Sequence, residues 1–229
     1  MRRSRSRAGP GSPGESVDEL AEAYLQALEK CDDDAALEVL RRSLVAGLDG
    51  PAIYLGVFQP AMDRVVVCWE QGTLRVGVEH RAIAMTRWLM DALVDDFKPT
   101  QRRRGVAPLL AGCVRDERHD LGLTMVVRFL RRDGRQVVDL GADVPEPEFA
   151  EMATRVNPSL LLLSAAQPAR LGAARATIEA VRGAGLSAPI LIGGVVFRHE
   201  PALATMAGAT ATAPDAAQAV ACVRQLLHA

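Results

Sequence analysis

The sequence predicts an α/β protein in which a helical bundle precedes a parallel sheet, and two patterns support this fold class. Between residues 15 and 99, apolar side chains recur at helical spacing. From residue 105 onward, short and continuously apolar runs alternate with helical stretches, as in right-handed βαβ units. With 229 residues, 49% hydrophobic and 24% charged, the chain has an ordinary globular composition and room for one large domain or two small ones.

Four helices are expected in the first part of the chain. The first begins at Ser16, which forms a capping-box pattern with Glu19. The second has an apolar stripe made of Leu37, Leu40, Leu44, Val45 and Leu48. The third spans residues 51–70 and is bent or divided at Pro60, and the fourth spans residues 78–97. Amphipathic helices joined by short turns predict an up-and-down four-helix bundle, which we expect to extend to residue 99.

Five apolar runs are expected to form a five-stranded parallel sheet of the flavodoxin-like or Rossmann-like type, in a domain over residues 105–229. These runs are residues 106–113, 137–140, 160–163, 189–192 and 209–211. Residues 100–104, with three consecutive arginines, are the expected linker, and residues 1–14 are expected to be a disordered basic tail. Because ligands of such sheets bind beyond the carboxyl ends of the strands, the loops there are expected to carry the chemistry.

Composition excludes several classes of protein. Only Lys30 and Lys98 are lysines and neither follows a glycine, so a P-loop is excluded and Schiff-base chemistry is not expected. A net charge of −1 and few, scattered aromatic residues do not fit a surface that binds nucleic acid. No apolar run is long enough to span a membrane. The four cysteines lie far apart without zinc-ligand spacing, which indicates buried thiols in a reducing cytoplasm.

Candidate site residues are expected at one rim of the sheet, in the loops that follow three of its strands. They are Glu117, His119 and Gly122 after the first strand, Ser164 after the third, and Gly193 and Gly194 after the fourth. A histidine with a carboxylate two residues earlier can bind a metal while the carboxylate holds its other ring nitrogen. One histidine cannot hold a bare metal ion, but it can supply the axial ligand of a metal in a macrocycle, and glycines leave room for such a large ligand. The alternative is a surface histidine on an ordinary loop, with glycines that serve turns.

The three loops resemble those of the cobalamin-binding domain, whose pattern is Asp-x-His-x-x-Gly, then Ser-x-Leu, then Gly-Gly. Here 41 residues separate Gly122 from Ser164 and 26 separate Ala166 from Gly193, and both spacings agree with that pattern. Two residues depart from it, because Glu117 stands in place of the Asp and Ala166 in place of the Leu. The resemblance covers the whole sheet domain.

This resemblance implies a cofactor and a role for each loop. It implies that His119 displaces the cofactor's own dimethylbenzimidazole and becomes the lower ligand of the cobalt, which is the base-off, His-on state. It also implies that the displaced base and its nucleotide tail enter a slot lined by Ser164, Gly193 and Gly194.

A second motif lies in the helical part, where Trp69 is followed after nine residues by Glu79-His80. This spacing resembles the bundles that cap adenosylcobalamin in light-sensing proteins. The resemblance implies that the Trp69 indole packs on the adenosyl group, while Glu79 and His80 form hydrogen bonds with it. The alternative is that Trp69 fills the core and that Glu79 and His80 are a solvated helix start.

The first hypothesis for function is a stand-alone cytoplasmic photoreceptor similar to the photocobilins. The resemblance implies that it binds adenosylcobalamin, and that light breaks the cobalt–carbon bond and changes the domain or oligomer arrangement. It implies a homo-oligomer, a dimer or larger, with an unknown downstream protein partner, and it allows a bilin such as biliverdin as a second chromophore. Direct DNA binding is not expected, because no DNA-binding domain precedes the bundle. Glu70 stands where the related transcription factors carry a His.

Two other hypotheses stay open. A corrinoid methyl-carrier subunit of a methyltransferase has the same layout, with an upper face that opens to partner enzymes. It ranks second because the spacing of Trp69 and Glu79-His80 favours an adenosyl cap. A cobalamin sensor that does not respond to light is the third, and the sequence does not separate it from the first. In none of the three is the chain expected to be an enzyme in its own right.

Overall fold

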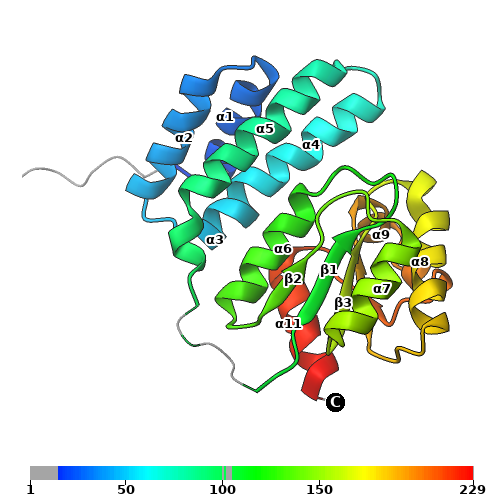
Figure 1. Ribbon diagram of the computed structural model, residues 1–229. Helices are drawn as coiled ribbons and strands as arrows, with labels where there is room; N and C mark the ends of the chain where they lie inside the picture. Colours follow the sequence, from blue (N-terminus) through cyan, green and yellow to red (C-terminus); the bar gives the residue numbers. More distant parts are fainter. Residues whose placement is uncertain (1–14, 100, 102–104, 229) are drawn as a thin grey trace, which may run out of the picture. The chain divides into compact units, whose positions relative to one another are not determined.

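The structure is a computed structural model that describes residues 15–99, 101 and 105–228 (Figure 1). These described residues form two compact units, which divide between Met90 and Asp91. The expected basic tail lies outside the described residues, as does the expected linker apart from residue 101. The division falls near the end of the last helix of the first unit. A short 3-10 turn after that helix, Val94–Phe97, belongs to the second unit, where the ring of Phe97 lies 5.4 Å from that of Phe129.

The first unit is helical throughout. Its α-helices are α1 (Val17–Glu29), α2 (Asp33–Val45), α3 (Gly50–Ile53), α4 (Gln59–Glu70) and α5 (Val76–Ala92). The Ser16 side chain accepts the backbone N–H of Glu19, whose carboxylate accepts the Ser16 N–H at 2.7 Å, so the predicted capping box is present. Asp32 and Asp49 cap α2 and α3 in the same way, each accepting a backbone N–H at 3.0 Å.

The irregularity predicted at Pro60 takes the form of a π-helical turn. Residues 50–70 stay helical, with the π turn Tyr54–Phe58 between α3 and α4, directly before Pro60. Gln59 donates its N–H to the Tyr54 carbonyl, five residues back. Because proline lacks the N–H of a regular helical bond, a wider turn accommodates it without breaking the helix.

Aromatic rings form the centre of this helical core. Phe58 lies 4.9 Å from Tyr24 and 5.7 Å from Tyr54, measured between ring centroids. Both tyrosine hydroxyls are hydrogen-bonded, Tyr24 to Thr86 at 2.9 Å and Tyr54 to the Met90 carbonyl at 2.8 Å. Burial raises the pKa of Tyr24, so its hydroxyl stays neutral. These hydrogen bonds connect the core of α1 and the π turn to α5.

The predicted apolar stripe of α2 is partly wrong. Leu44 is exposed and Val45 is 90% exposed, because the buried face of the helix turns to other positions. That face consists of Ala36, Val39, Leu40 and Ser43. The Ser43 hydroxyl donates to the Val39 carbonyl at 2.8 Å, which allows a polar residue on the buried side.

The second unit contains the predicted five-stranded parallel sheet, and the α/β fold class is confirmed. Its strands are β1 (Leu109–Cys113), β2 (Val137–Asp139), β3 (Leu160–Ser164), β4 (Ile190–Gly193) and β5 (Ala211–Thr212). Their order is β2-β1-β3-β4-β5, the flavodoxin-like order, in which the chain changes direction between β1 and β3. The loops after these two strands therefore diverge at a crevice, where α/β sheets bind ligands.

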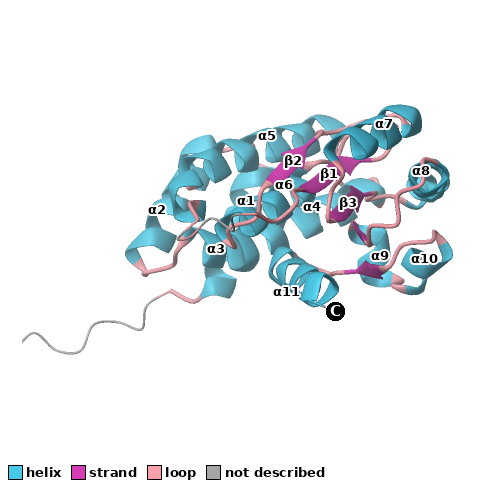
Figure 2. Cartoon of the chain, turned by 60° about the horizontal axis from the view of Figure 1, so that its bottom comes forward, coloured by secondary structure: helices cyan, strands magenta, loops and turns pink. Residues whose placement is uncertain are grey.

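Helices cover both faces of the sheet (Figure 2). Side chains of α6 (Leu121–Arg132) and α11 (Ala216–His228) pack on one face. The other face carries α7 (Glu146–Val156), α8 (Leu171–Gly183), α9 (Val195–His199) and α10 (Ala202–Met206). β1 and β3 are fully buried between these layers, which explains their continuously apolar sequences.

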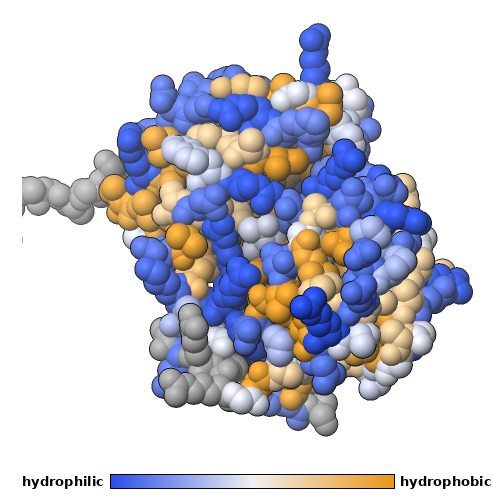
Figure 3. Space-filling model, in the orientation of Figure 1, coloured by the Kyte–Doolittle hydropathy of each residue, from blue (hydrophilic) through white to orange (hydrophobic). Residues whose placement is uncertain are grey.

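Polar and apolar side chains are interspersed on the visible face of the molecule (Figure 3). Among the described residues, no helix combines the length and hydropathy that crossing a membrane requires.

The four cysteines differ in their exposure. The expectation of buried thiols holds for Cys113, where burial raises the pKa to about 12. It is wrong for Cys31, which is exposed, and Cys68 and Cys222 are half-buried.

Candidate functional site

The candidate residues of the sheet domain meet at the carboxyl edge of β1, β3 and β4. Ser164 ends β3, where it pairs with Cys113 of β1 on one side and with Gly193 of β4 on the other. The buried Ser164 side chain forms a hydrogen bond with the Cys113 thiol. The loop that carries His119 follows β1 directly, and Gly122 lies in the first turn of α6.

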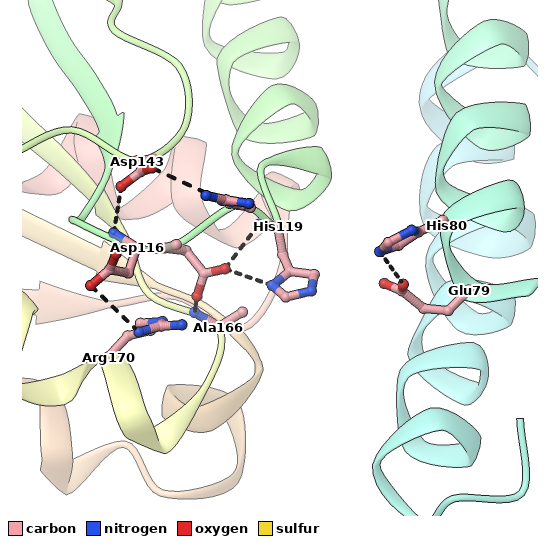
Figure 4. Close-up of polar contacts among 9 residues, drawn as sticks. Glu79, His80, Asp116, His119, Asp143, Ala166 and Arg170 are labelled. Carbon is pink, nitrogen blue, oxygen red and sulfur yellow. Dashed lines mark hydrogen bonds and ion pairs between the residues drawn. The ribbon is translucent and has the colours of Figure 1, made fainter. Parts of the chain in front are cut away.

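A buried carboxylate fixes the orientation of His119 (Figure 4). Oε1 of Glu117 accepts hydrogen bonds from Nδ1 of His119 at 2.7 Å and from its backbone N–H at 2.9 Å. Glu117 is fully buried, whereas the His119 side chain is 33% exposed. With Nδ1 on the carboxylate, Nε2 is the ring nitrogen that a metal would take.

The second oxygen of Glu117 reaches another loop. Oε2 accepts the backbone N–H of Ala166, in the loop after β3, at 2.7 Å. Burial raises the pKa of Glu117, but the hydrogen bonds from His119 and Ala166 and the proximity of the imidazole outweigh burial and hold the pKa below its ordinary value. The Glu117 carboxylate is therefore charged, and it joins the His119 loop to the loop that begins at Ser164. The glutamate side chain is long enough for Oε2 to reach the Ala166 N–H while Oε1 holds His119.

Changing Glu117 to glutamine is expected to weaken both the fold and the site. The amide has one acceptor oxygen, so its NH2 group would face a backbone or imidazole N–H and leave a buried donor without a partner. The expected loss is about 1–3 kcal/mol in the free energy of unfolding and about 10-fold to 100-fold in cobalamin affinity. Urea unfolding of the cofactor-free protein and a cobalamin titration measure the two effects.

Glu151→Gln is the control for this change, because Glu151 is an exposed carboxylate on α7 of the same unit. This variant is expected to match the wild type in both measurements. Wild-type stability and affinity in Glu117→Gln would show that the carboxylate does not hold the histidine.

Gly193 and Gly194 are adjacent, and a glycine is present at each for a different structural reason. Gly194 has φ +137°, and a Cβ there would lie 2.0 Å from the Ala165 carbonyl oxygen, so the loop backbone itself requires glycine. Gly193 has open space in that direction, because apart from the chain directly around it no atom lies within 4 Å of the position that a Cβ would take, and the same holds for Gly122. The sequence interpretation, room for a large ligand, therefore fits Gly193 and Gly122, whereas at Gly194 the glycine is needed by the fold.

These observations fit the group that the motif implies. The imidazole of His119 is held through one nitrogen, as an axial ligand requires. Beside it, Ser164 supplies a buried hydroxyl, and a side chain at Gly193 would fill the open space at the end of β4. His119 at this edge can ligate, from one side, a metal held in a macrocycle. The open space at the end of β4 can take a chain that is attached to the macrocycle.

The candidate residues of the helical unit lie near the turn between α4 and α5. Trp69 is half-buried in the last turn of α4, and Gly72 closes the turn with its N–H on the Trp69 carbonyl at 2.9 Å. Glu79 is 2% exposed in the first part of α5, and its carboxylate lies 3.5 Å from Nε2 of the exposed His80 (Figure 4). The alternative of a solvated helix start therefore holds for His80 and is wrong for Glu79. Whether these three residues form a cap on a cofactor stays a prediction.

Sequence patterns did not indicate the loop after β2. Asp143 in that loop contacts the residues that precede His119, and Arg170 at the start of α8 lies 3.8 Å from the Asp116 carboxylate (Figure 4). The sequence marks this loop only weakly, because the polar residues that follow the second expected strand form no motif. Left-handed backbone at Asp116 and Asp143 is visible only in the structure.

The fold and the site define a protein of the cobalamin-binding class, and comparisons with known proteins agree. Residues 108–221 match a family described as the B12 binding domain, and residues 20–94 match a second family with the same description. Dimethylamine corrinoid protein 1 of Methanosarcina acetivorans is 31% identical over 215 residues, which cover 93% of this chain and 99% of the relative. Dimethylamine corrinoid protein of Methanosarcina barkeri is 30% identical over 93% of this chain and 99% of its own length. The chain belongs to the family of B12-binding corrinoid proteins.

Solved structures show the same fold. The monomethylamine corrinoid protein of Methanosarcina barkeri superposes with a TM-score of 0.80, at 21% identity, over 92% of this chain and all of that one. The methanol:cobalamin methyltransferase complex of Methanosarcina barkeri has a TM-score of 0.51 at 19% identity, over 92% of this chain and 80% of that one. The arrangement of a helical unit followed by a five-stranded parallel sheet is thus the arrangement of a corrinoid protein.

Proposed function

We propose that the chain is a corrinoid methyl carrier, which binds cobalamin and presents it to a methyltransferase. The observation that carries this proposal is the similarity to dimethylamine corrinoid proteins, which extends over both units and covers 93% of the chain. This hypothesis ranked second on sequence motifs, and the comparisons support it better than light sensing.

The residues of this chain supply binding and orientation. When bound, cobalamin supplies the cobalt that accepts and releases the methyl group. His119 would hold the cobalt from below through Nε2, while Glu117 keeps Nδ1 hydrogen-bonded and the imidazole in place. Ser164 and Gly193 would line the path of the nucleotide tail, where the end of β4 leaves space.

The partner proposed here is a methyltransferase subunit. The name of one structural neighbour, a methanol:cobalamin methyltransferase complex, supports a partner of this kind. Homo-oligomerisation, expected from the resemblance to light sensors, has no support in the comparisons. The same is true of the adenosyl form of the cofactor and of a bilin.

The light sensor is the second candidate. Glu79 is buried and Trp69 is half-buried, and this burial favours a cofactor cap over an ordinary solvent-exposed helix surface. Cofactor preference separates the two functions. A carrier is expected to bind methylcobalamin, hydroxocobalamin and adenosylcobalamin with similar affinity, and Trp69→Ala should leave their ratio unchanged. A light sensor should prefer adenosylcobalamin by about 10-fold or more, which corresponds to roughly 1.4 kcal/mol, and Trp69→Ala should abolish that preference.

Competition titrations measure this ratio, with Trp88→Ala as the matched control. Trp88 is an exposed tryptophan on α5 of the same unit. Its substitution also removes an indole, but one that does not lie at the turn between α4 and α5. An adenosyl preference that Trp69→Ala removes and Trp88→Ala retains would contradict the carrier and support the light sensor.

A direct test adds a methyl donor. The chain, loaded with cobalamin and chemically reduced, is mixed with dimethylamine and the dimethylamine methyltransferase of Methanosarcina acetivorans. A donor-dependent change in the visible spectrum of the bound cofactor is expected, and omission of the methyltransferase should abolish it. No change with this system, nor with the corresponding trimethylamine, monomethylamine and methanol systems, would count against the carrier.

A further inference from the structure

Asp143 contacts three consecutive residues of the loop that carries His119. Its Oδ1 accepts the Asp116 N–H at 2.6 Å, and its own N–H donates to the Glu117 carbonyl at 2.9 Å. Its Oδ2 lies 4.0 Å from Nε of Arg118, the residue directly before His119. Both the backbone and the side chain of Asp143 therefore define the path of the chain just before the histidine.

The backbone on both sides of this contact is left-handed. Asp116 has φ +63° and Asp143 has φ +55°, a region that residues other than glycine enter rarely, with aspartate and asparagine among the exceptions. Such conformations persist where surrounding contacts hold them. Here the contacts are reciprocal, because each loop supplies the other with a backbone donor or acceptor. Arg170 adds a further contact, with Nη1 at 3.8 Å from Asp116 Oδ2.

We infer that Asp143 is a positioning residue for cobalt ligation, which acts through residues 116–118 and holds the loop in the conformation that presents His119. This inference rests on the proposed cobalamin site. Glu117 reaches His119 and Ala166 with its two carboxylate oxygens only while its own main chain keeps this path, and the Asp143 N–H holds the Glu117 carbonyl. Asp143 thus acts on the histidine through the loop.

Three substitutions separate the side chain from the backbone conformation. Asp143→Gly removes the carboxylate and keeps left-handed backbone accessible. Asp143→Asn keeps an acceptor for the Asp116 N–H and tolerates the left-handed region. Asp143→Ala loses both properties. The Asp143 side chain is 40% exposed, so its removal takes no packing from the core, and the variants are expected to fold.

The probe is cob(II)alamin, bound to protein in which histidine carries the heavy, spin-one-half isotope of nitrogen. Electron paramagnetic resonance then shows a superhyperfine doublet when histidine is the axial ligand and a triplet when the cofactor's own base remains. The wild type and Asp143→Asn are expected to show the doublet. In Asp143→Gly and Asp143→Ala the histidine-bound fraction should fall, with a loss of about 10-fold or more in cobalamin affinity.

Hydrogen exchange of the cofactor-free protein is the second measurement, and it does not depend on cobalamin. Asp143→Gly should speed the exchange of the amides of residues 115–120, whereas Asp143→Asn should not. Asn157→Ala is the matched control, because Asn157 is also left-handed, with φ +46°, but lies at the end of α7. It should lower stability while retaining the doublet and slow exchange in the His119 loop.

The outcomes distinguish this inference from the proposed function. A wild-type protein without the doublet would overturn the cobalt-ligand assignment on which both rest. A wild-type doublet that persists in Asp143→Gly with unchanged affinity and exchange would overturn the role of Asp143 and leave the carrier intact. If Asp143→Asn behaves like Asp143→Gly, the hydrogen bond to Asp116 is not the route, and the inference fails in the form given.

Discussion

Changing His119 to glycine is expected to lower the affinity for cobalamin by about 100-fold or more, because loss of the metal ligand should exceed the effect of losing its supporting carboxylate. The bound cofactor should also lose the His-on spectrum. The change should be confined to the missing imidazole, since Glu117 would keep its hydrogen bonds to the backbone of residue 119 and to Ala166. Absorption spectra and a cobalamin titration measure the change.

Added imidazole tests whether the missing ring is the cause. It should restore the His-on spectrum in His119→Gly, since a free imidazole can occupy the space that the side chain leaves. His199→Ala is the control, because His199 is an exposed histidine at the end of α9 in the same unit. An unchanged spectrum and affinity in His119→Gly would refute the axial-ligand assignment.

Changing Gly194 to alanine is expected to destabilise the sheet domain by about 3 kcal/mol or more, since it combines a disfavoured backbone conformation with a steric clash. The added Cβ would lie 2.0 Å from the Ala165 carbonyl oxygen and 3.0 Å from the Ala166 Cα, so the backbone of the loop after β3 would have to move. Thermal and urea unfolding of the cofactor-free protein measure this loss.

Gly193 supplies the contrasting variant. Gly193→Val adds a β-branched residue to the end of a strand, where apart from the adjoining residues no atom lies within 4 Å of the new Cβ, so the fold should persist. Cobalamin uptake should be lost, because the side chain fills the space proposed for the nucleotide tail. The proposed course of the tail is incorrect if the folded variant takes up cobalamin normally. Wild-type stability in Gly194→Ala would contradict the steric argument.

Local sequence signals predicted much of the fold because each depends on neighbours along the chain. The capping box at Ser16 and Glu19 and the apolar runs of β1 and β3 are of this kind. The edge strand β5 is short and half-buried, so its weak signal gave only its approximate place. The exposed Val45 shows the limit of helical periodicity, since an apolar residue does not by itself say which face of α2 is buried.

Within the site, sequence spacing indicated the residues that carry chemistry but not those that hold them. Glu117 and His119 are separated by one residue, so their contact is local. Asp143 meets Asp116 across 27 positions, and the left-handed backbone of both has no signature in composition or periodicity. The comparisons favour the function that sequence motifs ranked second, for a related reason. A short motif around Trp69 outweighed the similarity of the whole chain, which only comparison of complete sequences can measure.

The π turn has a consequence for insertions and deletions. Because it holds one residue more than a regular turn, losing one residue between Tyr54 and Phe58 would let the segment close as an ordinary α-helix. Because the wide turn holds this extra residue within one revolution, the positions beyond it would keep their faces. Loss of one residue from the regular part of α4, between Pro60 and Trp69, would instead rotate the following positions by about 100° around the helix axis and turn Trp69 away from its present face. The π turn is therefore the place in this segment where relatives could differ by one residue and still present the same side chains from α4.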